Sequence, residues 1–510
     1  MKKLMLSLAT AALAVPAAAQ QYIVVDGETP VLADDVERIT YEQNDQFDQM
    51  LLPGILAADP KTTLFSQALQ ATGLADTLRN YWYADYKAKE QRYRYISHTW
   101  QEVAYYNQHR YKNYTVFAET DDVFAAQGIT SLSQLKAYAK QVYDAAFPED
   151  AGVSDLTDRR NSLNRFVAYH ILKHGSTYWY LTALDKEEWL SMGLCVDSTK
   201  TDMSAWYGTL MPEGTLKCTY PLSGGERGLY LNRRGLGDQP DKYGKQVRGA
   251  LIVANGEEGF DHTCFNGNYF HIDRILAYDQ TTREEVLGSE LWRVDFKTLS
   301  PDIMNNAADL RANYWTSVGA VPQTGTNRIY AWDCMENVAG DTSLASVGLV
   351  ARKAHASLYA WQGDEMNIFD AFDLTVKLPP LPAGEWEVRM GTFVLNTRPV
   401  IRVYLNDEVV IDALDCSKLQ FEDEQERARV RCAPTECMYF SPNGVQTSFS
   451  SVDLAVRYVL GRIQSDGKSD NTLRLQFIAP PQTDLTPEMQ LDYFEFVPKA
   501  VFDNQEIPEE

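Results

Sequence analysis

The feature that most restricts the fold of this chain is a period of two in the apolar residues of its C-terminal part. One segment, GEWEVRM, spans residues 384–390. Its apolar members are Trp386, Val388 and Met390, and its polar members are Glu385, Glu387 and Arg389. Successive side chains of a β-strand point to opposite faces of the sheet, so this alternation predicts a strand. We expect the first set to be buried and the second set to face solvent.

Further segments repeat this pattern between turn residues. They are VIRVYLNDEVVI at residues 400–411, LRLQFIAP at residues 473–480, and LDYFEFVP at residues 491–498. In the first of them, Asn406 and Asp407 are typical turn residues that separate two strands. Several short strands bounded by turns are typical of an antiparallel β-sandwich. The pattern predicts such a sandwich over residues 316–500, followed by an acidic tail at residues 501–510.

The first residues have the features of a signal peptide. Lys2 and Lys3 precede the apolar stretch LMLSLATAALAV, which is too short to span a bilayer, and residues 17–19 are alanines that suit cleavage. No cysteine follows this cleavage site, so the usual lipoprotein anchor is missing. No later apolar run is long enough for a membrane helix. The pattern predicts that residues 1–19 are removed and that the protein is secreted, periplasmic or on the cell surface.

The net charge argues against two classes of partner. The 510 residues include 47 Lys and Arg against 70 Asp and Glu, which gives a formal net charge of −23. Nucleic-acid binding depends on Lys and Arg that neutralise phosphates, and docking on anionic lipid depends on basic clusters. We therefore expect no nucleic-acid partner and no contact with an anionic membrane surface.

The seven cysteines leave disulfide pairing open. Export permits disulfides, and the pairs that lie near in sequence are Cys195 with Cys218 and Cys432 with Cys437. An odd number leaves at least one thiol free or bonded to another molecule, which keeps homo-oligomer contacts open. No C-x-x-C pair occurs, so the sequence predicts neither a redox motif nor paired zinc ligands.

The N-terminal half has helical and strand patterns in alternation. The predicted elements are a helix over residues 62–78, a buried strand over residues 115–118, a helix that begins near Asp122, a helix over residues 159–175 and a helix that begins near Pro301. Thr120 or Asp121 would cap the second of these helices, and Gly175 would end the third.

Three blocks occur in the order that is typical of fasciclin-type domains. The first is TVFAETDDVF, residues 115–124, in which Glu119 stands where the family usually has proline. The second is the Tyr-His pair of VAYHIL, and the third is NGNYFHIDRIL, residues 266–276, with one residue added before its histidine. The motif residues are Thr115, Phe117, Thr120, Tyr169, His170, Asn266, Gly267, His271 and Asp273. The chain thus resembles a fasciclin-type domain over about residues 59–278.

The resemblance implies an α/β fold with helices around a β-wedge, and adhesion as the family's usual role. Residues 20–58 would form an N-terminal segment, and residues 279–315 a connector. The stretches 81–114 and 176–250 exceed what the family usually carries there, so the domain is enlarged. The C-terminal part resembles the galactose-binding-like jelly-roll modules of secreted bacterial proteins, with PPLPAGEWEVRMGTFV leading into the alternating strands.

The histidines of these blocks have a functional and a structural interpretation. His271 and Asp273 would share one face of a strand and supply two members of a triad, but neither G-x-S-x-G nor a cysteine in a nucleophile's setting accompanies them. His170 and His174 lie four apart, which is a metal-ligand spacing, but no third ligand is indicated. We expect structural roles, with His271 joining the two motif strands, and neither a metal nor a cofactor.

Aromatic and basic residues are interleaved from Tyr81 to Tyr114. Tyr and Trp rings can lie flat against sugars or peptides, and they are enriched at binding surfaces. The candidate ligand-binding residues are Trp82, Tyr86, Trp100 and Tyr105. In the alternative interpretation, this segment is a long hairpin whose aromatic residues pack on the core of the domain. The two interpretations are compatible if they apply to opposite faces.

These patterns predict a non-catalytic, secreted adhesion or ligand-binding protein of the cell envelope, whose partner is a glycan or a cell-surface protein. Two alternatives stay open. One is an exported glycan-processing enzyme with an accessory carbohydrate-binding sandwich, which requires a pocket with facing carboxylates or a cluster of His, Asp and Ser. The other is a purely architectural envelope protein, which would have a large exposed apolar patch.

Overall fold

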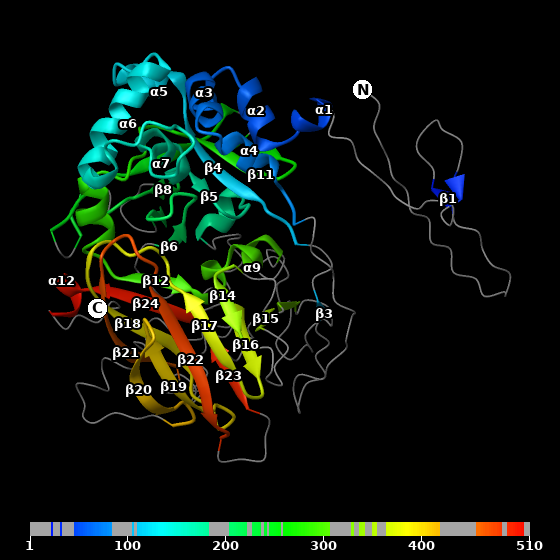
Figure 1. Ribbon diagram of the computed structural model, residues 1–510, viewed down its shortest axis with the longest axis vertical. Coiled ribbons are helices and arrows are strands. Elements are labelled where there is room, and N and C mark those ends of the chain that lie inside the picture. Colours follow the sequence, from blue (N-terminus) through cyan, green and yellow to red (C-terminus); the bar gives the residue numbers. More distant parts are fainter. Residues whose placement is uncertain are drawn as a thin grey trace. The chain divides into compact units, whose positions relative to one another are not determined.

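A computed structural model shows the fold (Figure 1). It describes residues 22–23, 31–32, 45–83, 105–106, 110–182, 203–221, 227–235, 239–241, 244–256, 259–306, 328–330, 336–341, 349–353, 364–418, 455–481 and 487–503. The chain forms two compact units, residues 1–48 and 49–510. The elements of the first unit are an antiparallel pair, β1 (Tyr22–Ile23) with β2 (Val31–Leu32), and α1 (Asp45–Asp48). The predicted signal peptide lies outside the described residues.

In the second unit, the helices that begin after Thr120, Ser131 and Asn161 are capped by these polar side chains. The α-helices are α2 (Leu52–Ala58), α3 (Thr63–Ala71), α4 (Leu74–Arg79), α5 (Asp121–Ala126), α6 (Leu132–Ala146), α7 (Ser162–Tyr169), α9 (Pro301–Asn306) and α12 (Lys499–Phe502). Single 3-10 or π turns are η2 (Pro148–Asp150), η3 (Tyr178–Thr182), η5 (Thr282–Leu287) and η6 (Phe296–Leu299). The Thr120 side chain accepts a hydrogen bond from the backbone N of Val123, which confirms the predicted cap of α5.

Two predicted helices are shorter than the sequence pattern indicated. The helix over residues 62–78 is divided into α3 and α4, because Gly73 between them adopts a left-handed φ of 69°. The helix over residues 159–175 ends at Tyr169, because Ile171 and Leu172 leave it to form β5 (Ile171–Leu172) beside β4 (Tyr114–Glu119). Gly175 is therefore not a helix cap, and strand pairing has overridden the local helical pattern.

A mixed sheet forms the core beneath these helices. Its order is β5, β4, β11 (Gly267–Ile272), β9 (Ala250–Val253), β8 (Tyr230–Leu231), β7 (Thr215–Tyr220) and β6 (Met203–Gly208), and β10 (His262–Cys264) also pairs with β11. Every residue of β4 is buried, as predicted for residues 115–118. Figure 1 shows α2 to α7 gathered around β4, β5 and β11. The helices thus cover the end of the sheet at which β4 and β11 lie.

The C-terminal part consists of further sheets, as the period of two predicted. One sheet is β12 (Trp292–Asp295), β24 (Tyr493–Pro498), β18 (Gly384–Phe393) and β21 (Ala455–Ser465). A second is β14 (Val338–Gly340), β17 (Asp373–Lys377), β22 (Thr472–Ala479), β19 (Val400–Leu405) and β20 (Glu408–Asp415). A third is β23 (Glu488–Leu491), β16 (Asp364–Phe369), β15 (Leu349–Lys353), β13 (Arg328–Tyr330) and β3 (Tyr105–Tyr106). Among these described strands, only β3 with β13 is a parallel pair.

Local turn chemistry explains the hairpin between β19 and β20. Asn406 and Asp407 have φ values of 49° and 66°, the left-handed pair that a type I′ turn requires. The Asn406 side chain also forms two hydrogen bonds with the start of β22. Its Oδ1 accepts from Thr472 N, and its Nδ2 donates to Asn471 Oδ1. The predicted strand, turn and strand are confirmed.

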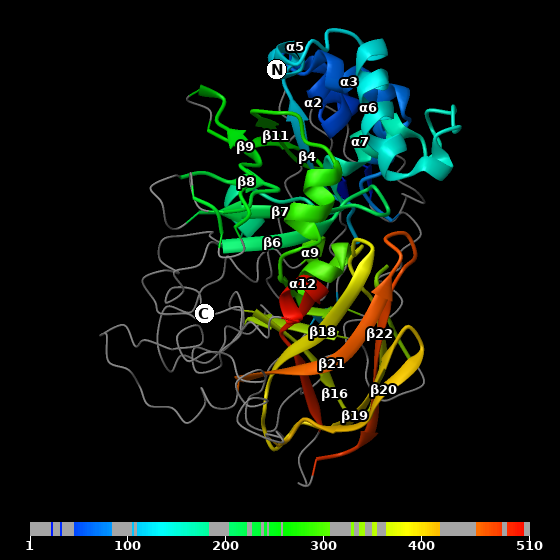
Figure 2. The same ribbon diagram turned by 90° about the vertical axis from the view of Figure 1, so that its left-hand side faces the viewer.

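The predicted faces of β18 are half correct. Trp386, Val388 and Met390 are buried as expected. Glu387 and Arg389 are also buried, with exposures of 1% and 3%, which corrects the prediction that they face solvent. The reason is tertiary: β24 and β21 flank β18, and α12 and β23 contact it as well. Figure 2 shows β21 and α12 beside β18.

Ion pairs make this burial tolerable. Arg389 Nε donates to Glu387 Oε1 over 2.8 Å, and Arg389 Nη1 lies 3.6 Å from Glu495 Oε2 on β24. Arg293 on β12 reaches the other oxygen of Glu495, with Nη2 at 2.8 Å from Oε1. Buried charges that are paired in this way avoid most of the desolvation penalty. The apparent alternation of apolar and polar residues in GEWEVRM therefore describes two buried faces of a central strand.

The segment predicted as a connector supplies part of this architecture. It contributes β12 to the sheet that contains β18, and its helix α9 begins at Pro301 as predicted. Trp292 of β12 stacks on Trp206 of β6 with ring centroids 6.5 Å apart and meets Trp386 edge-on at 5.2 Å. One row of tryptophans therefore joins the mixed sheet to the C-terminal sheets.

Candidate functional site

The three sequence blocks meet in space. β11 pairs in parallel with β4, so that Asn268 lies opposite Thr115 and Phe270 opposite Phe117. The rings of Phe117 and Phe270 stack with centroids 5.9 Å apart. Thr115 Oγ1 donates to the carbonyl of His174 and accepts from the backbone N of Ser176, which fixes the chain that follows β5. Segments far apart in the sequence are thus joined in one buried layer.

The Tyr-His block is attached to the same layer. His170 Nε2 lies 2.8 Å from Glu119 Oε1 at the end of β4, and both side chains are fully buried. The second ring nitrogen, Nδ1, donates to the carbonyl of Phe166 over 2.7 Å. Glu119 Oε1 also accepts from Leu276 N over 2.9 Å. Because both ring nitrogens of His170 are occupied within the protein, this histidine is structural.

The other block residues also have structural partners. Tyr169 donates its hydroxyl to the carbonyl of Thr215 and accepts from Asn232 Nδ2. Asn266 Oδ1 accepts from Leu52 N, and Asn266 Nδ2 donates to Leu78 O, so this side chain links α2 and α4 to the start of β11. These are long-range hydrogen bonds in a buried setting, where an unpaired amide would be costly.

His271 has a different partner from the one that its sequence neighbours suggested. Its Nε2 lies 2.7 Å from Asp59 Oδ2, and Tyr269 donates its hydroxyl to the same oxygen over 3.1 Å. Asp273 lies beyond the end of β11, where its Oδ1 accepts from Leu251 N and its Oδ2 lies 2.7 Å from Arg248. The side chain of His271 thus contacts Asp59 and joins β11 to the end of α2, which corrects the expectation that it joins the two motif strands.

We predict a pH-dependent contribution from Asp59. Burial raises the pKa of this carboxyl, but hydrogen bonds from Lys61 N, His271 and Tyr269 outweigh it and lower the pKa below 3.8. A carboxylate whose pKa is lowered on folding stabilises the folded state above its ordinary pKa and loses this effect as the pH falls through the folded value. Urea unfolding of Asp59→Asn should therefore show a smaller loss of stability below about pH 4 than the wild type.

The matched control for this experiment is Asp122→Asn, which removes an exposed carboxylate on α5. It should keep the acid dependence of the wild type. Equal acid dependence in Asp59→Asn and the wild type would contradict the assigned role of Asp59.

No metal centre is found among the described residues. No group of three or more His, Cys, Asp or Glu side chains gathers there as metal ligands would. His170 lies against Glu119, and His174 is buried against the ring of Tyr207.

Three buried thiols bear on the disulfide prediction. Cys218, Cys264 and Cys416 are free, which argues against the option that pairs Cys218 with Cys195. Cys195, Cys432 and Cys437 lie outside the described residues. Burial raises the pKa of Cys264 and of Cys416 to about 12, and it also raises the pKa of Cys218. Thiols of this kind are poor nucleophiles at neutral pH because the thiolate is the reactive form.

An exposed aromatic cluster lies near the start of the inserted segment. Trp82 pairs with Tyr111 in an antiparallel bridge, and the ring of Tyr81 stacks on Trp82 with centroids 6.4 Å apart. Phe265 meets Tyr81 edge-on at 5.2 Å, and its backbone N donates to the carbonyl of Met50. Trp82 is 46% exposed and Phe265 is 53% exposed. We call Met50, Tyr81, Trp82, Tyr111 and Phe265 the aromatic platform.

Only part of the predicted ligand-binding set can be placed. Trp82 lies on the aromatic platform, and Tyr105 lies in β3, which pairs with β13. Tyr86 and Trp100 lie outside the described residues. Phe265 and Met50 were not among the predicted residues, because neither belongs to the aromatic segment and only the fold brings them to it.

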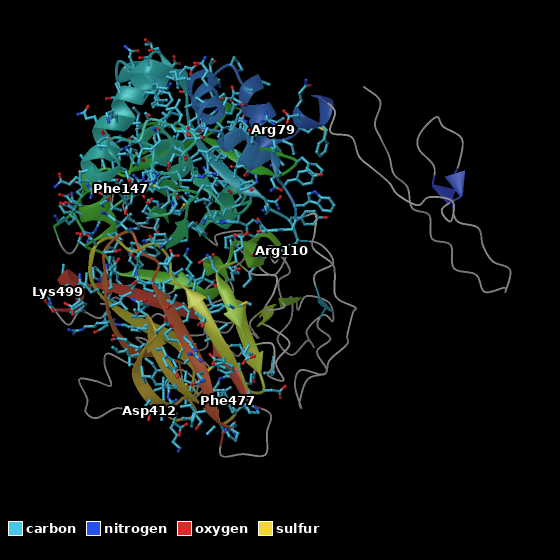
Figure 3. All side chains as sticks on the ribbon, viewed as in Figure 1. Arg79, Arg110, Phe147, Asp412, Phe477 and Lys499 are labelled. Atoms are coloured by element: carbon cyan, nitrogen blue, oxygen red, sulfur yellow. The ribbon has the colours of Figure 1, made fainter. Side chains whose placement is uncertain are left out.

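Residues 81–83 and 110–112 form a short ladder. On the face of this ladder opposite the aromatic platform, the ring of Tyr83 is covered by other side chains, in the manner of the alternative interpretation. Arg110 lies over the ring of Tyr83 at 3.5 Å and forms two hydrogen bonds with Asp302 of α9, at 2.8 and 3.1 Å. Lys112 also lies over this ring. Arg110 is found beside α9 in Figure 3. Tyr83 thus anchors the segment, and Trp82 is left at the surface.

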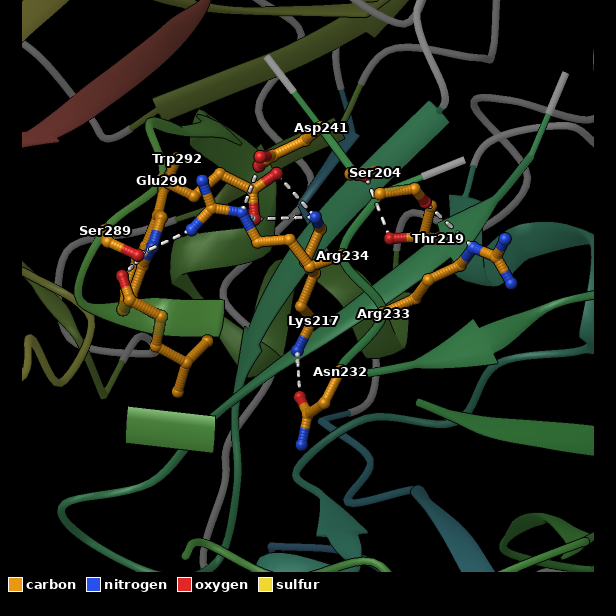
Figure 4. Close-up of polar contacts among 12 residues, drawn as sticks. Ser204, Lys217, Thr219, Asn232, Arg233, Arg234, Asp241, Ser289, Glu290 and Trp292 are labelled. Atoms are coloured by element: carbon orange, nitrogen blue, oxygen red, sulfur yellow. Dashed lines mark hydrogen bonds and ion pairs between the residues drawn. The ribbon is translucent and has the colours of Figure 1, made fainter. Parts of the chain in front are cut away.

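A second polar cluster joins Lys217 of β7 and Arg234, both buried, to carboxylates that are half-buried (Figure 4). Lys217 Nζ lies 2.5 and 2.7 Å from the two carboxylate oxygens of Glu290. Arg234 Nε lies 2.5 Å from Asp241 Oδ2, and its Nη1 donates to Ser289 Oγ over 2.6 Å. Each carboxylate is therefore neutralised by a cation within the fold, which is the arrangement of a structural linkage.

Comparisons with known proteins name no family. No family model matches the chain, and no curated protein matches it. Among solved structures, the chain is similar to a family 35 carbohydrate-binding module from Clostridium thermocellum at 10% identity and a TM-score of 0.18, over 34% of this chain and 98% of that one. It is similar to the K1 cleaved adhesin domain of Lys-gingipain from Porphyromonas gingivalis at 8% identity and a TM-score of 0.18, over 32% and 99% of the two chains.

A third likeness is to a Paenibacillus xanthan lyase, at 12% identity and a TM-score of 0.21, over 32% of this chain. The chain spans only 13% of that enzyme. Because these identities and TM-scores are low, none of the likenesses identifies a function. Within the described part of the chain, no helix has the length and apolar character needed to cross a membrane.

Proposed function

We propose that this protein is a secreted, non-catalytic glycan-binding protein of the cell envelope, and that the aromatic platform binds the glycan. In this proposal, residues 59–278 are an enlarged fasciclin-type domain and the C-terminal sheets are a galactose-binding-like jelly-roll sandwich. The observation that carries the proposal is the exposure of Trp82, whose ring stacks on Tyr81, which in turn contacts the exposed Phe265.

Exposed rings in contact with one another support binding of an extended, partly apolar ligand. A large aromatic side chain is expensive to leave in water, so a cluster of them at the surface is a typical sign of an interaction site. Pyranose rings have apolar faces that stack on Trp and Tyr, and their hydroxyl groups find partners at the edges of such rings.

A glycan array is the test of this proposal, with the full mature chain and its Trp82→Ala variant. Truncating a central aromatic anchor should raise the Kd for the best glycan about tenfold or more, because such anchors carry most of the binding energy. The matched control is Trp179→Ala. Trp179 is 47% exposed, nearly as much as Trp82, but its ring neighbours are Tyr178 and Tyr220.

The two variants separate the outcomes. Loss of binding in Trp82→Ala with retention in Trp179→Ala would support the aromatic platform. Loss of binding in Trp179→Ala with retention in Trp82→Ala would place the site at Trp179. If the folded wild-type protein binds no glycan on the array, glycan binding is contradicted.

A further inference from the structure

A cavity of about 270 Å³ lies between the mixed sheet and the C-terminal sheets. Its walls include Tyr207 of β6, Lys377 and Pro380 at the end of β17, and Asn337 before β14. Ligand pockets often occur at such boundaries between packed parts, and those for drug-sized ligands start at roughly 300 Å³. The cavity therefore has room for a small ligand of about one sugar ring.

The charge of the lining is the opposite of that of the whole protein. The chain has 70 acidic and 47 basic residues, but the described residues that line the cavity include Lys173 and Lys377 and no Asp or Glu. Lys377 has a partner outside the lining, because its Nζ lies 2.7 Å from Asp470 Oδ2. Lys173 is half-buried, and its ammonium group has neither a hydrogen bond nor an ion pair with any described residue. A shielded ammonium group without an anion favours an anionic ligand.

The surroundings of Lys173 strengthen this argument. Burial lowers the pKa of Lys173, and the positive charges of Lys377 and Arg159 lower it further, against the opposing effect of Glu336 and Asp470. The folded protein thus holds this cation in an unfavourable setting. A carboxylate placed between Lys173 and Lys377 would relieve both the desolvation and the repulsion.

The remaining lining suits a polyhydroxylated ring. Asn337 Nδ2 donates to the carbonyl of Leu299, which leaves its Oδ1 as an acceptor without a partner among the described residues. Tyr207 donates its hydroxyl to the carbonyl of Leu181, so that its ring is held as a wall. Leu378, Pro379 and Pro380 add an apolar surface. The cavity therefore offers cations, one amide acceptor and apolar walls in a space of limited size.

We propose that this cavity binds an acidic monosaccharide of the uronate class, with its carboxylate at Lys173 and Lys377 and a hydroxyl group at Asn337. This site is separate from the aromatic platform, and its assignment does not depend on glycan binding there. It gives the protein a second specificity, for a charged sugar or sugar terminus.

Calorimetric titration of the full mature chain tests this proposal, with D-glucuronate, D-glucose and acetate as probes. Glucuronate should bind, glucose should bind at least about tenfold more weakly because it lacks the charge, and acetate should also bind more weakly because it lacks the ring. Lys173→Met should weaken glucuronate binding about tenfold or more. The matched control, Lys136→Met on α6, removes the same charge elsewhere and should leave the Kd unchanged.

A second measurement on the wild-type protein keeps the test valid if Lys173→Met fails to fold. Acylation of Lys173 by an amine-reactive reagent, followed by peptide mass spectrometry, should be slowed by glucuronate and not by glucose. Equal Kd values for glucuronate and glucose, or no protection of Lys173, would overturn the proposal. Binding of acetate as tight as that of glucuronate would overturn the assignment to an acidic sugar.

Discussion

Substitution of Gly267 by alanine is expected to lower the free energy of unfolding by about 4 kcal/mol, which is exceptional for the addition of one methyl group. Gly267 begins β11 with a φ of 140°, a region that residues with a side chain rarely adopt. A Cβ atom there would lie 1.8 Å from the carbonyl oxygen of Tyr114, and 2.9 Å from the nitrogen of the same residue.

The conflict cannot be relieved by a rotamer change, because the opposing atoms belong to the backbone. Relief requires β11 to move away from β4 at the point where Tyr114 N donates to Asn266 O over 3.0 Å. This pairing holds two motif blocks together, so the strain would spread along the parallel ladder. Urea unfolding should show a lower midpoint for Gly267→Ala, or the variant should not accumulate as a folded protein.

The control for this prediction is Gly128→Ala. Gly128 also has a positive φ, of 76°, but a Cβ atom there would meet no atom within 4 Å. Alanine at this position should cost only the roughly 1–2 kcal/mol of the left-handed conformation. Equal losses in the two variants would show that the approach of Tyr114 to Gly267 does not limit stability.

Substitution of His170 by phenylalanine should cost about 3–5 kcal/mol, because it leaves the fully buried side chain of Glu119 without its partner. The new ring would keep the aromatic neighbours of the imidazole, since Phe65 and Phe166 lie 5.5 and 4.6 Å from its centroid. The expected loss therefore reports on polar pairing and not on packing. Glu119 would retain one hydrogen bond, from Leu276 N.

A double-mutant cycle measures this coupling. Glu119→Leu combined with His170→Phe removes both members of the pair, so it should be more stable than the sum of the two single losses predicts. Recovery should be incomplete, because Leu276 N loses its acceptor in the double variant. Additive losses in urea unfolding would contradict a coupled pair.

Glu119 shows how far sequence reasoning reached in the candidate site. The sequence indicated that this residue departs from the family pattern, where proline is usual, but it gave no partner for the charge. Because α7 ends at Tyr169, the imidazole of His170 reaches the end of β4 and contacts Glu119. This contact is the physical reason for a glutamate where the family usually has proline. The sequence likewise did not indicate Asp59 as the partner of His271, because the two residues are remote in sequence.

The aromatic platform illustrates the other limit of sequence reasoning. Composition alone indicated an unusual aromatic segment and named Trp82 within it. Whether a given ring is buried depends on what the fold places against it. Tyr83 is covered by Arg110 and Lys112, whereas Trp82, its neighbour in sequence, is exposed beside Phe265 from another part of the chain.

By itself, the sequence determined the elements whose causes are local. The strands of the C-terminal part follow from a period of two, the turn at Asn406 and Asp407 follows from residues that tolerate a positive φ, and the start of α5 follows from the cap at Thr120. These features depend on steric limits and hydrogen bonds within a few residues, so neighbouring residues suffice to specify them.

The tertiary structure decided which residues distant in sequence contact one another and whether the polar face of a strand is buried. It turned Glu387 and Arg389 inward, drew Ile171 and Leu172 out of a helix into β5, and brought Lys173 and Lys377 to the same cavity. Burial and pairing depend on which distant segment covers a face, and that choice is made by the packing of the whole unit. The free energy of these contacts exceeds the local preferences that they override.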